Sequence, residues 1–212
     1  DKMMDLGFEQ ELGLILDALP QKRQNLLFSA TYPPKVQAIA SKITKNALEV
    51  VTQTETPTVE RIVQRAIKVN HENRSPLLRH LLREHNWKKV LVFMANKRTC
   101  ENIAMKFRKH GFSAEAFHGD LVQEGRAWAL QALKEGTVNI LFATDIAARG
   151  LDIDDVNCVI NFDLPRSTED YIHRIGRTGR AGKEGVAISF IGLEDEAHFA
   201  LIEKRCAVRL AK

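Results

Sequence analysis

Two short segments, residues 90–93 (Val-Leu-Val-Phe) and 140–143 (Ile-Leu-Phe-Ala), are apolar at every position. A strand covered on one face alternates apolar and polar residues, so continuous apolar runs indicate strands buried on both faces. Such strands belong to parallel sheets that are packed between two layers of helices. These two runs therefore predict a doubly wound α/β domain.

The remaining pattern supports the same architecture, because strand and helix patterns alternate from residue 57 onward. We expect strands at 62–69, 89–94, 114–118, 139–144, 157–163 and 185–191. We expect helices at about 76–85, 97–110, 123–135, 168–178 and 194–207. No apolar run approaches the roughly 20 residues that span a bilayer, so we expect no membrane segment.

The first 50 residues follow a different plan. They predict two helices, near 8–18 and 33–44, with a single strand at 25–28 between them, and one strand cannot form a sheet. We therefore expect residues 1–50 to be the end of a domain that begins earlier. The apolar faces of residues 8–44 would then need to be covered, and we expect a second copy of the chain to cover them, in a homodimer or a swapped assembly.

The segment that follows has the composition of a linker, since it is polar, rich in Thr and contains Pro57. We expect an interdomain linker at 51–58 and a complete second domain at 59–212. Cysteines stand only at 100, 158 and 206, which fits neither a disulfide framework nor a zinc pair. With no basic, apolar leader at the start, this favours a cytoplasmic protein without a metal site.

Charge is unevenly distributed along the chain. Residues 57–116 hold 13 Lys/Arg against 5 Asp/Glu, whereas the whole chain has a formal net charge of only +4. A basic segment is typical of proteins that bind a polyanion such as nucleic acid. On charge alone, solvated helix faces are the simpler explanation.

The densest motif is His-Arg-Ile-Gly-Arg-Thr-Gly-Arg at residues 173–180. On a continuous helix, Arg174, Arg177 and Arg180 would share one side, and three clustered guanidinium groups favour an anion opposite them. Gly176 and Gly179 each weaken a helix by about 1 kcal/mol, which close approach of a ligand or a backbone would offset. The motif predicts contact with phosphate groups, and a solvated basic helix is the alternative.

A second motif, Ala-Thr-Asp-Ile-Ala-Ala-Arg-Gly-Leu-Asp, occupies residues 143–152 directly after a buried strand. Ligands of open α/β sheets bind outside the carboxyl ends of the strands. Thr144 and the backbone of Gly150 could approach a phosphate there, and Asp152 could accept hydrogen bonds from a ribose. Alternatively, Asp145 caps a helix and Gly150 forms a turn.

Weaker signals flank these motifs. Arg126 lies in the first turn of an expected helix, where backbone amides and a guanidinium could bind a phosphate, although a surface arginine is nearly as good an explanation. Ser29 and Thr31 follow the strand expected at 25–28 and could bond across a domain interface or simply cap the next helix. The Gly-Lys pair at 182–183 lacks the Gly and the Ser or Thr that a P-loop needs.

Together and in this order, these motifs resemble those of the DEAD-box family of ATP-dependent RNA helicases. The resemblance begins at residues 1–8, which look like the stretch starting at the last Asp of the Asp-Glu-Ala-Asp motif. It implies a RecA-like doubly wound sheet, mostly parallel, with helices on both faces, for residues 59–212. Residues 1–50 would be the end of the first RecA-like, ATP-binding domain.

The resemblance also implies roles for single residues on the nucleotide side. Arg177 and Arg180 would be arginine fingers on the γ-phosphate of ATP. His173 would join the network around the attacking water. Asp152 would bind the ribose, with Arg149 nearby.

On the RNA side, the resemblance implies contacts to the sugar–phosphate backbone, which carry no sequence information. The expected RNA-binding residues are Thr144, Arg126, Gly119, Asn96, Lys97 and Gly150. Ser29 and Thr31 would couple ATP hydrolysis to unwinding. Val122 stands where many family members carry Ser before the Gln, a departure that touches only a helix cap.

The implied function is ATP-dependent unwinding of RNA, with ATP and Mg²⁺ held mainly by the first RecA-like domain, a partner in cis. The sequence contains no P-loop, no complete carboxylate pair and no adenine-reading segment, so we expect the chain alone not to hydrolyse ATP. Two alternatives are a non-catalytic RNA-binding α/β module that acts as a clamp and a DNA translocase of the same superfamily.

Overall fold

The computed structural model describes residues 7–28, 34–44, 46–50, 61–148, 153, 156–179 and 183–206. The chain forms two compact units, Asp1–Gln53 and Thr54–Lys212. The segment expected to be a linker, 51–58, lies outside the described residues, as do Ser29, Thr31, Arg149, Gly150, Asp152 and Arg180.

The second unit is built on a six-stranded sheet in which every pair of neighbouring strands is parallel. The strands in spatial order are β1 (Ile62–Lys68), β6 (Gly185–Ile191), β5 (Cys158–Asn161), β2 (Val90–Met94), β4 (Ile140–Thr144) and β3 (Ala114–Phe117). All six expected strands are present, each within a few residues of its expected bounds. This confirms the α/β fold class with a parallel sheet.

The apolar runs that predicted the sheet form its centre. All five residues of β2 are buried, and their side chains alternate between two hydrophobic clusters on opposite faces. Val90 and Val92 pack in one cluster, and Leu91 and Phe93 pack in the other. A strand buried on both faces is apolar at every position, so it lacks the alternation of apolar and polar residues that a half-exposed strand shows.

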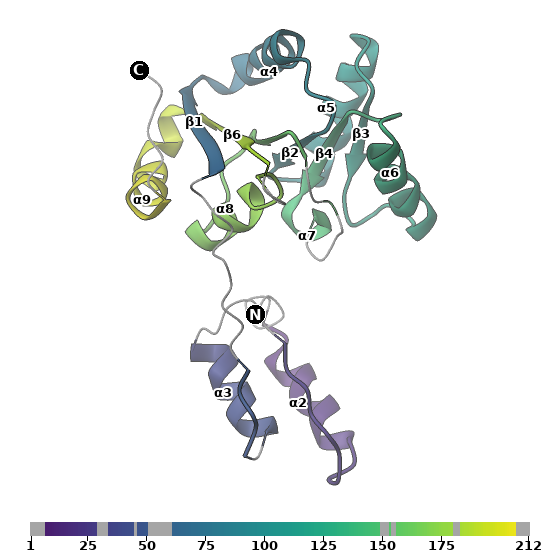
Figure 1. Ribbon diagram of the computed structural model, residues 1–212, viewed down its shortest axis with the longest axis vertical. Coiled ribbons are helices and arrows are strands. Elements are labelled where there is room, and N and C mark those ends of the chain that lie inside the picture. Colours follow the sequence, from purple (N-terminus) through teal and green to yellow (C-terminus); the bar gives the residue numbers. More distant parts are fainter. Residues whose placement is uncertain are drawn as a thin grey trace. The chain divides into compact units, whose positions relative to one another are not determined.

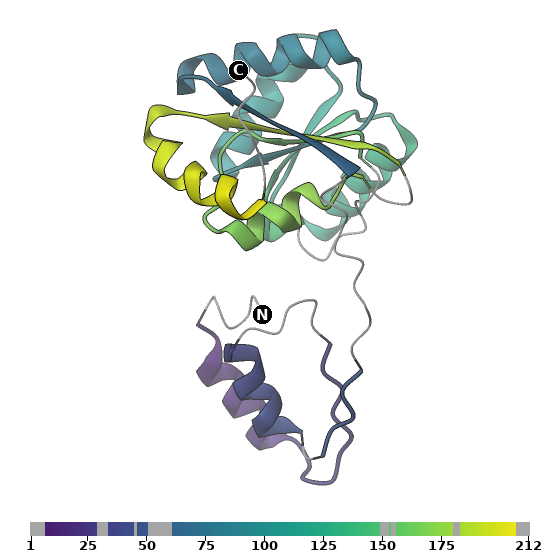
Figure 2. The ribbon, with the colours of Figure 1, turned by 60° about the vertical axis from the view of Figure 1, so that its left-hand side comes forward.

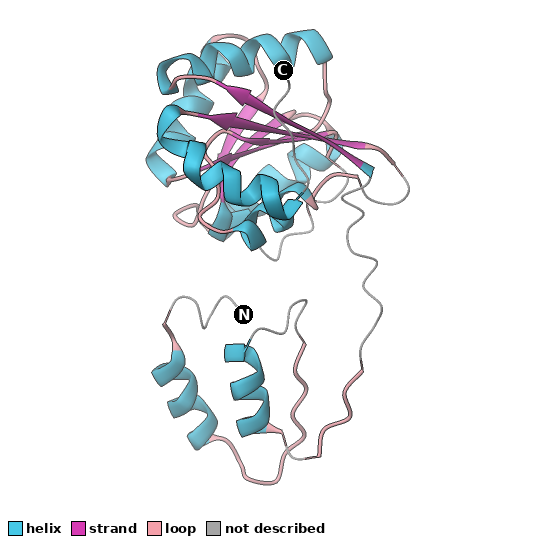
Figure 3. Cartoon of the chain, turned by 90° about the vertical axis from the view of Figure 1, so that its left-hand side faces the viewer, coloured by secondary structure: helices cyan, strands magenta, loops and turns pink. Residues whose placement is uncertain are grey.

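Helices cover both faces of this sheet (Figures 1 and 3). One face packs against α4 (His71–His85) and α5 (Lys97–Lys109), which lie on the same side of the sheet in Figure 2. The opposite face packs against α6 (Gln123–Glu135), α7 (Asp145–Ala148), α8 (Thr168–Ile175) and α9 (Glu196–Cys206). A short 3₁₀ turn, η2 (Leu193–Asp195), precedes α9.

Two helix boundaries differ from expectation. Helix α4 begins at His71 rather than near residue 76 and contains Pro76 in its interior, because its buried side, which includes Leu78 and Leu82, outweighs the lost backbone hydrogen bond. Helix α8 ends at Ile175 instead of 178. Beyond it, the backbone N–H groups of Arg177 and Thr178 donate to the carbonyls three residues earlier, at 3.2 and 3.0 Å.

The glycines of the 173–180 motif explain why α8 stops there. Gly179 has a φ of +68°, a backbone conformation that costs a glycine nothing. A Cβ on Gly185 would lie 2.4 Å from the backbone nitrogen of Gly179, so two backbones touch at this point. The close approach that offsets the helix-weakening glycines of this motif is therefore a contact between two backbone segments.

The first unit contains α2 (Glu9–Ala18) and α3 (Pro34–Ile43), close to their expected positions. The strand expected at 25–28 is wrong: in the described part of this unit these residues pair with no other strand. Leu26 and Phe28 are 70% and 88% exposed, so this apolar segment lacks the neighbour that would make it a strand.

All three cysteines are free thiols and buried. Burial raises the pKa of the Cys100 thiol to about 12. None of the helices in the described ranges is long and apolar enough to cross a membrane.

Candidate functional site

The carboxyl ends of the central strands finish side by side. The register pairs Met94 of β2 with Thr144 of β4, Phe117 of β3 with Ala143, and Phe93 with Asn161 of β5. The loops after these strands must therefore meet at one edge of the sheet, which we call the carboxyl edge. Ligands of open α/β sheets bind at such an edge.

Lys97, which follows β2, and Asp120, which follows β3, bridge two of these loops. The Nζ atom of Lys97 lies 2.7 Å from Oδ1 and 2.6 Å from Oδ2 of Asp120. A hydrogen bond from Lys97 holds the pKa of Asp120 below its ordinary value. An anion that binds Lys97 has to compete with this carboxylate.

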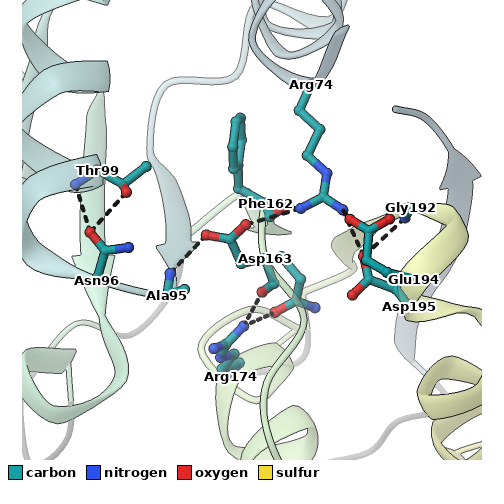
Figure 4. Close-up of polar contacts among 11 residues, drawn as sticks. Arg74, Ala95, Asn96, Thr99, Phe162, Asp163, Arg174, Gly192, Glu194 and Asp195 are labelled. Carbon is teal, nitrogen blue, oxygen red and sulfur yellow. Dashed lines mark hydrogen bonds and ion pairs between the residues drawn. The ribbon is translucent and has the colours of Figure 1, made fainter. Parts of the chain in front are cut away.

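Asn96 caps a helix, in addition to the RNA contact that is expected of it. Its side-chain oxygen accepts hydrogen bonds from the backbone nitrogen of Thr99 at 2.9 Å and from the Thr99 hydroxyl at 2.8 Å (Figure 4), which caps the N-terminus of α5. Because the oxygen is engaged, the amide nitrogen is the atom suited to an external acceptor such as a phosphate.

Arg126 reaches the same edge from the first turn of α6. Its guanidinium lies over the Phe117 ring, 5.0 Å from the centroid, and makes long hydrogen bonds to the carbonyls of His118 at 3.5 Å and Ala147 at 3.4 Å. These contacts orient the group between two loops of the edge. A guanidinium carries five N–H donors, so it has the capacity to bind a phosphate as well.

Thr144 and Gly119 complete the set. Thr144 is the half-buried last residue of β4, and Gly119 is exposed after β3. A Cβ on Gly119 would have no atom within 4 Å, so nothing in the described structure requires a glycine there. The structure thus brings together five of the six expected RNA-binding residues, and the sixth, Gly150, lies outside the described residues.

Helix α8 carries the motif that was expected to contact phosphate groups. His173 is exposed and Arg177 is half-buried, whereas Arg174 between them is only 3% exposed. The expectation that Arg174 and Arg177 share one helix side is wrong, because α8 ends at Ile175, and Arg180 lies outside the described residues. Arg174 is buried, and its side chain makes structural contacts inside the protein.

The partners of Arg174 explain its burial. Its Nε and Nη2 atoms bind the two carboxylate oxygens of Asp145 at 2.6 and 2.7 Å, and Nη1 donates to Oδ1 of Asn161 at 3.0 Å and to the Asp163 carbonyl at 2.7 Å. The guanidinium also lies 4.8 Å from the centroid of the Phe93 ring. Asp145 therefore anchors α8 to the end of β4, beyond the helix-capping role considered from sequence.

A second buried arginine, Arg74 of α4, was missed by the sequence analysis. Its Nη1 donates to Oδ1 of Asp163 and to the Phe162 carbonyl, both at 3.0 Å, and its Nη2 binds Asp195 at 2.6 Å. The other oxygen of Asp163 accepts the backbone N–H of Ala95 at 2.8 Å (Figure 4). This network fixes the loop that presents Asn96 and Lys97. Its signal in the sequence is an arginine in helical register with Leu78 and Leu82.

Comparison with known proteins decides what this arrangement is. Residues 73–182 match the family model of the helicase conserved C-terminal domain, a stretch that runs from α4 through the 173–180 motif. Over nearly the whole chain, the sequence is also similar to DEAD-box proteins. The chain belongs to the DEAD-box family.

Two DEAD-box relatives illustrate the similarity. The chain is 40% identical over 204 residues to the DEAD-box ATP-dependent RNA helicase CshA of Bacillus subtilis, covering 96% of this chain and 41% of that protein. It is 41% identical over 197 residues to the ATP-dependent RNA helicase DBP2 of Lodderomyces elongisporus, covering 90% of this chain and 35% of that protein. The chain thus spans well under half the length of these DEAD-box relatives.

Solved DEAD-box structures have the same fold. S. cerevisiae Dbp5 bound to RNA and ADP BeF3 matches with a TM-score of 0.81 at 31% identity, over 97% of this chain and 55% of that chain. A DEAD box protein from Methanococcus jannaschii matches with a TM-score of 0.66 at 37% identity, over 99% of this chain and 56% of that chain. The second RecA-like domain of the DEAD-box fold is therefore present here.

Proposed function

We propose that this chain is the nucleic-acid-binding and phosphate-sensing half of an ATP-dependent RNA helicase. The observation that carries the proposal is the meeting of Asn96, Lys97, Gly119, Arg126 and Thr144 at the carboxyl edge. They come from three strand ends and one helix N-terminus, far apart in sequence. Amide, ammonium and guanidinium donors there suit phosphate oxygens, and contacts to a backbone alone give binding that ignores base sequence.

The nucleotide side rests on α8 and the turn after it. Arg177 and Arg180 would reach the γ-phosphate of ATP, His173 would orient the attacking water, and Asp152 and Arg149 would hold the ribose. Arginine fingers contribute about 10³–10⁵ in rate when nucleotide and Mg²⁺ are in place. The ion pair between Arg174 and Asp145 supports this assignment, because it fixes α8 against the strand end that carries Thr144.

Residues 1–50 would complete the first RecA-like domain, with 51–58 as the linker and 59–212 as the second domain. ATP and Mg²⁺ would be held mainly by that first domain, in cis. Exposed apolar side chains of the first unit, such as Leu14 at 72% and Phe28 at 88%, fit a surface that such a domain covers. In its absence a second copy of the chain would cover them, which light scattering of the purified chain over a concentration series tests.

The deciding experiment is a titration of the chain with single-stranded RNA, comparing Gly119→Ala, Thr144→Ala and Arg126→Ala with wild type. Gly119→Ala is the sharpest variant, because the added methyl meets nothing within 4 Å in the described part of the protein and is placed to obstruct an approaching ligand. We expect unchanged stability and weaker RNA binding. Gly13→Ala, in α2 of the first unit, is the control glycine, since its Cβ also meets nothing within 4 Å and its backbone is not in the left-handed region.

Equal binding by wild type and all three variants would remove the RNA assignment from the carboxyl edge. Catalysis is tested separately. We expect no ATP hydrolysis by this chain alone, and Mg²⁺-dependent turnover by it would contradict the shared active site. In a protein containing both domains, Arg177→Ala should abolish RNA-stimulated hydrolysis. Retained function there would favour a non-catalytic clamp.

A further inference from the structure

More than half of the basic charge of residues 57–116 lies away from the carboxyl edge, although Lys97 is at that edge. Segments 79–89 and 106–113 together hold seven Lys/Arg and a single acidic residue, Glu84. They form the ends of α4 and α5 and the turns that lead into β2 and β3. These turns are at the opposite, amino ends of the strands.

A pocket of about 340 Å³ lies between these two segments. Its lining comprises Leu82, Arg83, Asn86, Trp87, Lys88, Gly111, Phe112, Ser113, Asn139 and Ile140. We call this pocket, with the cations Arg79, Arg83, Lys88, Lys89, Lys106, Arg108 and Lys109 of the two segments, the amino-edge surface. Trp87 and Phe112 contribute aromatic side chains to its lining, and the cations flank it, with Arg108 paired to Glu115 at 3.0 Å.

Aromatic rings in this surface are held flat against cationic or polar groups. The His85 and Trp87 rings stack with their centroids 4.4 Å apart and an interplanar angle of 23°. The Arg83 guanidinium lies 5.4 Å from the Phe112 centroid. Trp87 and Phe112 also line the pocket, and aromatic side chains are the groups on which nucleic-acid bases stack.

Helix dipoles explain only part of the charge. Cations in the last turn of a helix are stabilised by the partial negative charge there, and Arg83, Lys106 and Lys109 fit that rule. Lys88 and Lys89 follow α4 outside any helix, and dipoles do not call for the aromatic pocket. Lys88 and Lys109 are both exposed to solvent.

We infer that the amino-edge surface is a second binding site for single-stranded RNA, which holds phosphates on its cations and a base against Trp87. This inference rests on the proposed function and adds a second contact with the RNA strand, outside the carboxyl edge. The two sites lie at opposite edges of one sheet, so each can be disabled without touching the other.

The test uses the 212-residue chain and a single-stranded oligouridylate, titrated at several salt concentrations. Each phosphate contact on a single strand contributes about 0.7 to the slope of log affinity against log salt. Lys88→Gln with Lys109→Gln should therefore lower the slope by about 1.4. The control pair, Arg65→Gln with Lys204→Gln, removes the same charge from exposed positions on β1 and α9 and should leave the slope unchanged.

Tryptophan fluorescence tests whether a nucleic-acid base lies against Trp87. Trp128→Phe leaves Trp87 as the one tryptophan of two in the sequence. We expect oligouridylate to quench Trp87, and Lys88→Gln with Lys109→Gln to reduce that quenching. An unchanged slope in the pocket variant, or equal quenching by polyglutamate, would overturn the assignment. If Arg126→Ala weakens RNA binding while oligouridylate still quenches Trp87, the two sites bind RNA independently. A failed assignment of the carboxyl edge can then be told from a failed assignment of the amino-edge surface.

Discussion

Arg174 and Asp145 form a two-pronged ion pair, with N–O distances of 2.6 and 2.7 Å, that ties the last turn of α8 to the first residue of α7. The arginine is 3% exposed and the carboxylate side chain 28%. In the proposed helicase, this pair holds the nucleotide-facing helix at a fixed position relative to the RNA-facing strand end.

Breaking this pair should be costly. Removing one member of a buried pair leaves an uncompensated charge and typically costs about 3–5 kcal/mol. We expect Arg174→Met to lower the free energy of unfolding by that amount, as measured by urea denaturation. Adding Asp145→Asn to Arg174→Met should cost less than Asp145→Asn does in wild type. Additive effects of the two changes would show that the pair is not coupled.

Two glycines should respond to alanine with opposite signs. A Cβ on Gly185 would lie 2.4 Å from the backbone nitrogen of Gly179 and from the Thr178 hydroxyl, so Gly185→Ala forces backbone to move. We expect a large loss in melting temperature. Gly125, in the first turn of α6, has its nearest contact at 3.8 Å, and Gly125→Ala should stabilise the helix by about 0.5–1 kcal/mol. A smaller loss for Gly185→Ala than for Gly119→Ala would contradict the packing described here.

Val122 offers a stabilising change. It is the N-cap residue of α6, has an extended backbone and makes no side-chain capping hydrogen bond. Val122→Ser supplies an oxygen for the unpaired amides of the first turn and should add about 1 kcal/mol to the free energy of unfolding. Because the valine is 69% exposed, little apolar burial is lost. Val122→Ala is the control and should give no gain in urea denaturation.

The ion pair between Lys97 and Asp120 should affect the titration of Asp120 at acid pH. The hydrogen bond from Lys97 lowers the pKa of Asp120 from its ordinary 3.8, so the bridge stabilises the fold above that pH and is lost as pH falls through the lowered pKa. Carboxyl chemical shifts followed by NMR should show the low midpoint. Lys97→Met should return it toward 3.8, whereas Lys134→Met should not. A midpoint unaffected by Lys97→Met would mean that the pair does not persist in solution.

The sheet could be predicted because its physics is local. Residues buried on both faces must be apolar at every position, so β2 and β4 are evident in the sequence, and in a parallel sheet the loops that follow the strands share one edge. The position of Lys97 near the loop after β3 follows from that. The resemblance to DEAD-box proteins groups the RNA-side residues, and the parallel sheet explains why they share one edge.

Other features depend on tertiary contacts that no local pattern reveals. Spacing alone places Arg174 and Arg177 on one helix side, yet the contact of Gly179 with Gly185 ends the helix between them. Residues 25–28 have strand-like composition and no neighbouring strand in the described part of their unit. The burial of Arg74 depends on Asp163 and Asp195, which are about 90 and 120 positions away.

The strand order also has a consequence for how the protein is made. The neighbour of β1 in the sheet is β6, which is the last strand to be synthesised and also separates β1 from β5. On the ribosome, β1 waits without that neighbour until residue 191 has emerged, while β2, β3, β4 and β5 can already associate. Pairing between the two ends of a chain is slow because a long loop must close first. Full resistance of the nascent chain to proteases should therefore arrive late in translation, after partial protection of β2, β3, β4 and β5.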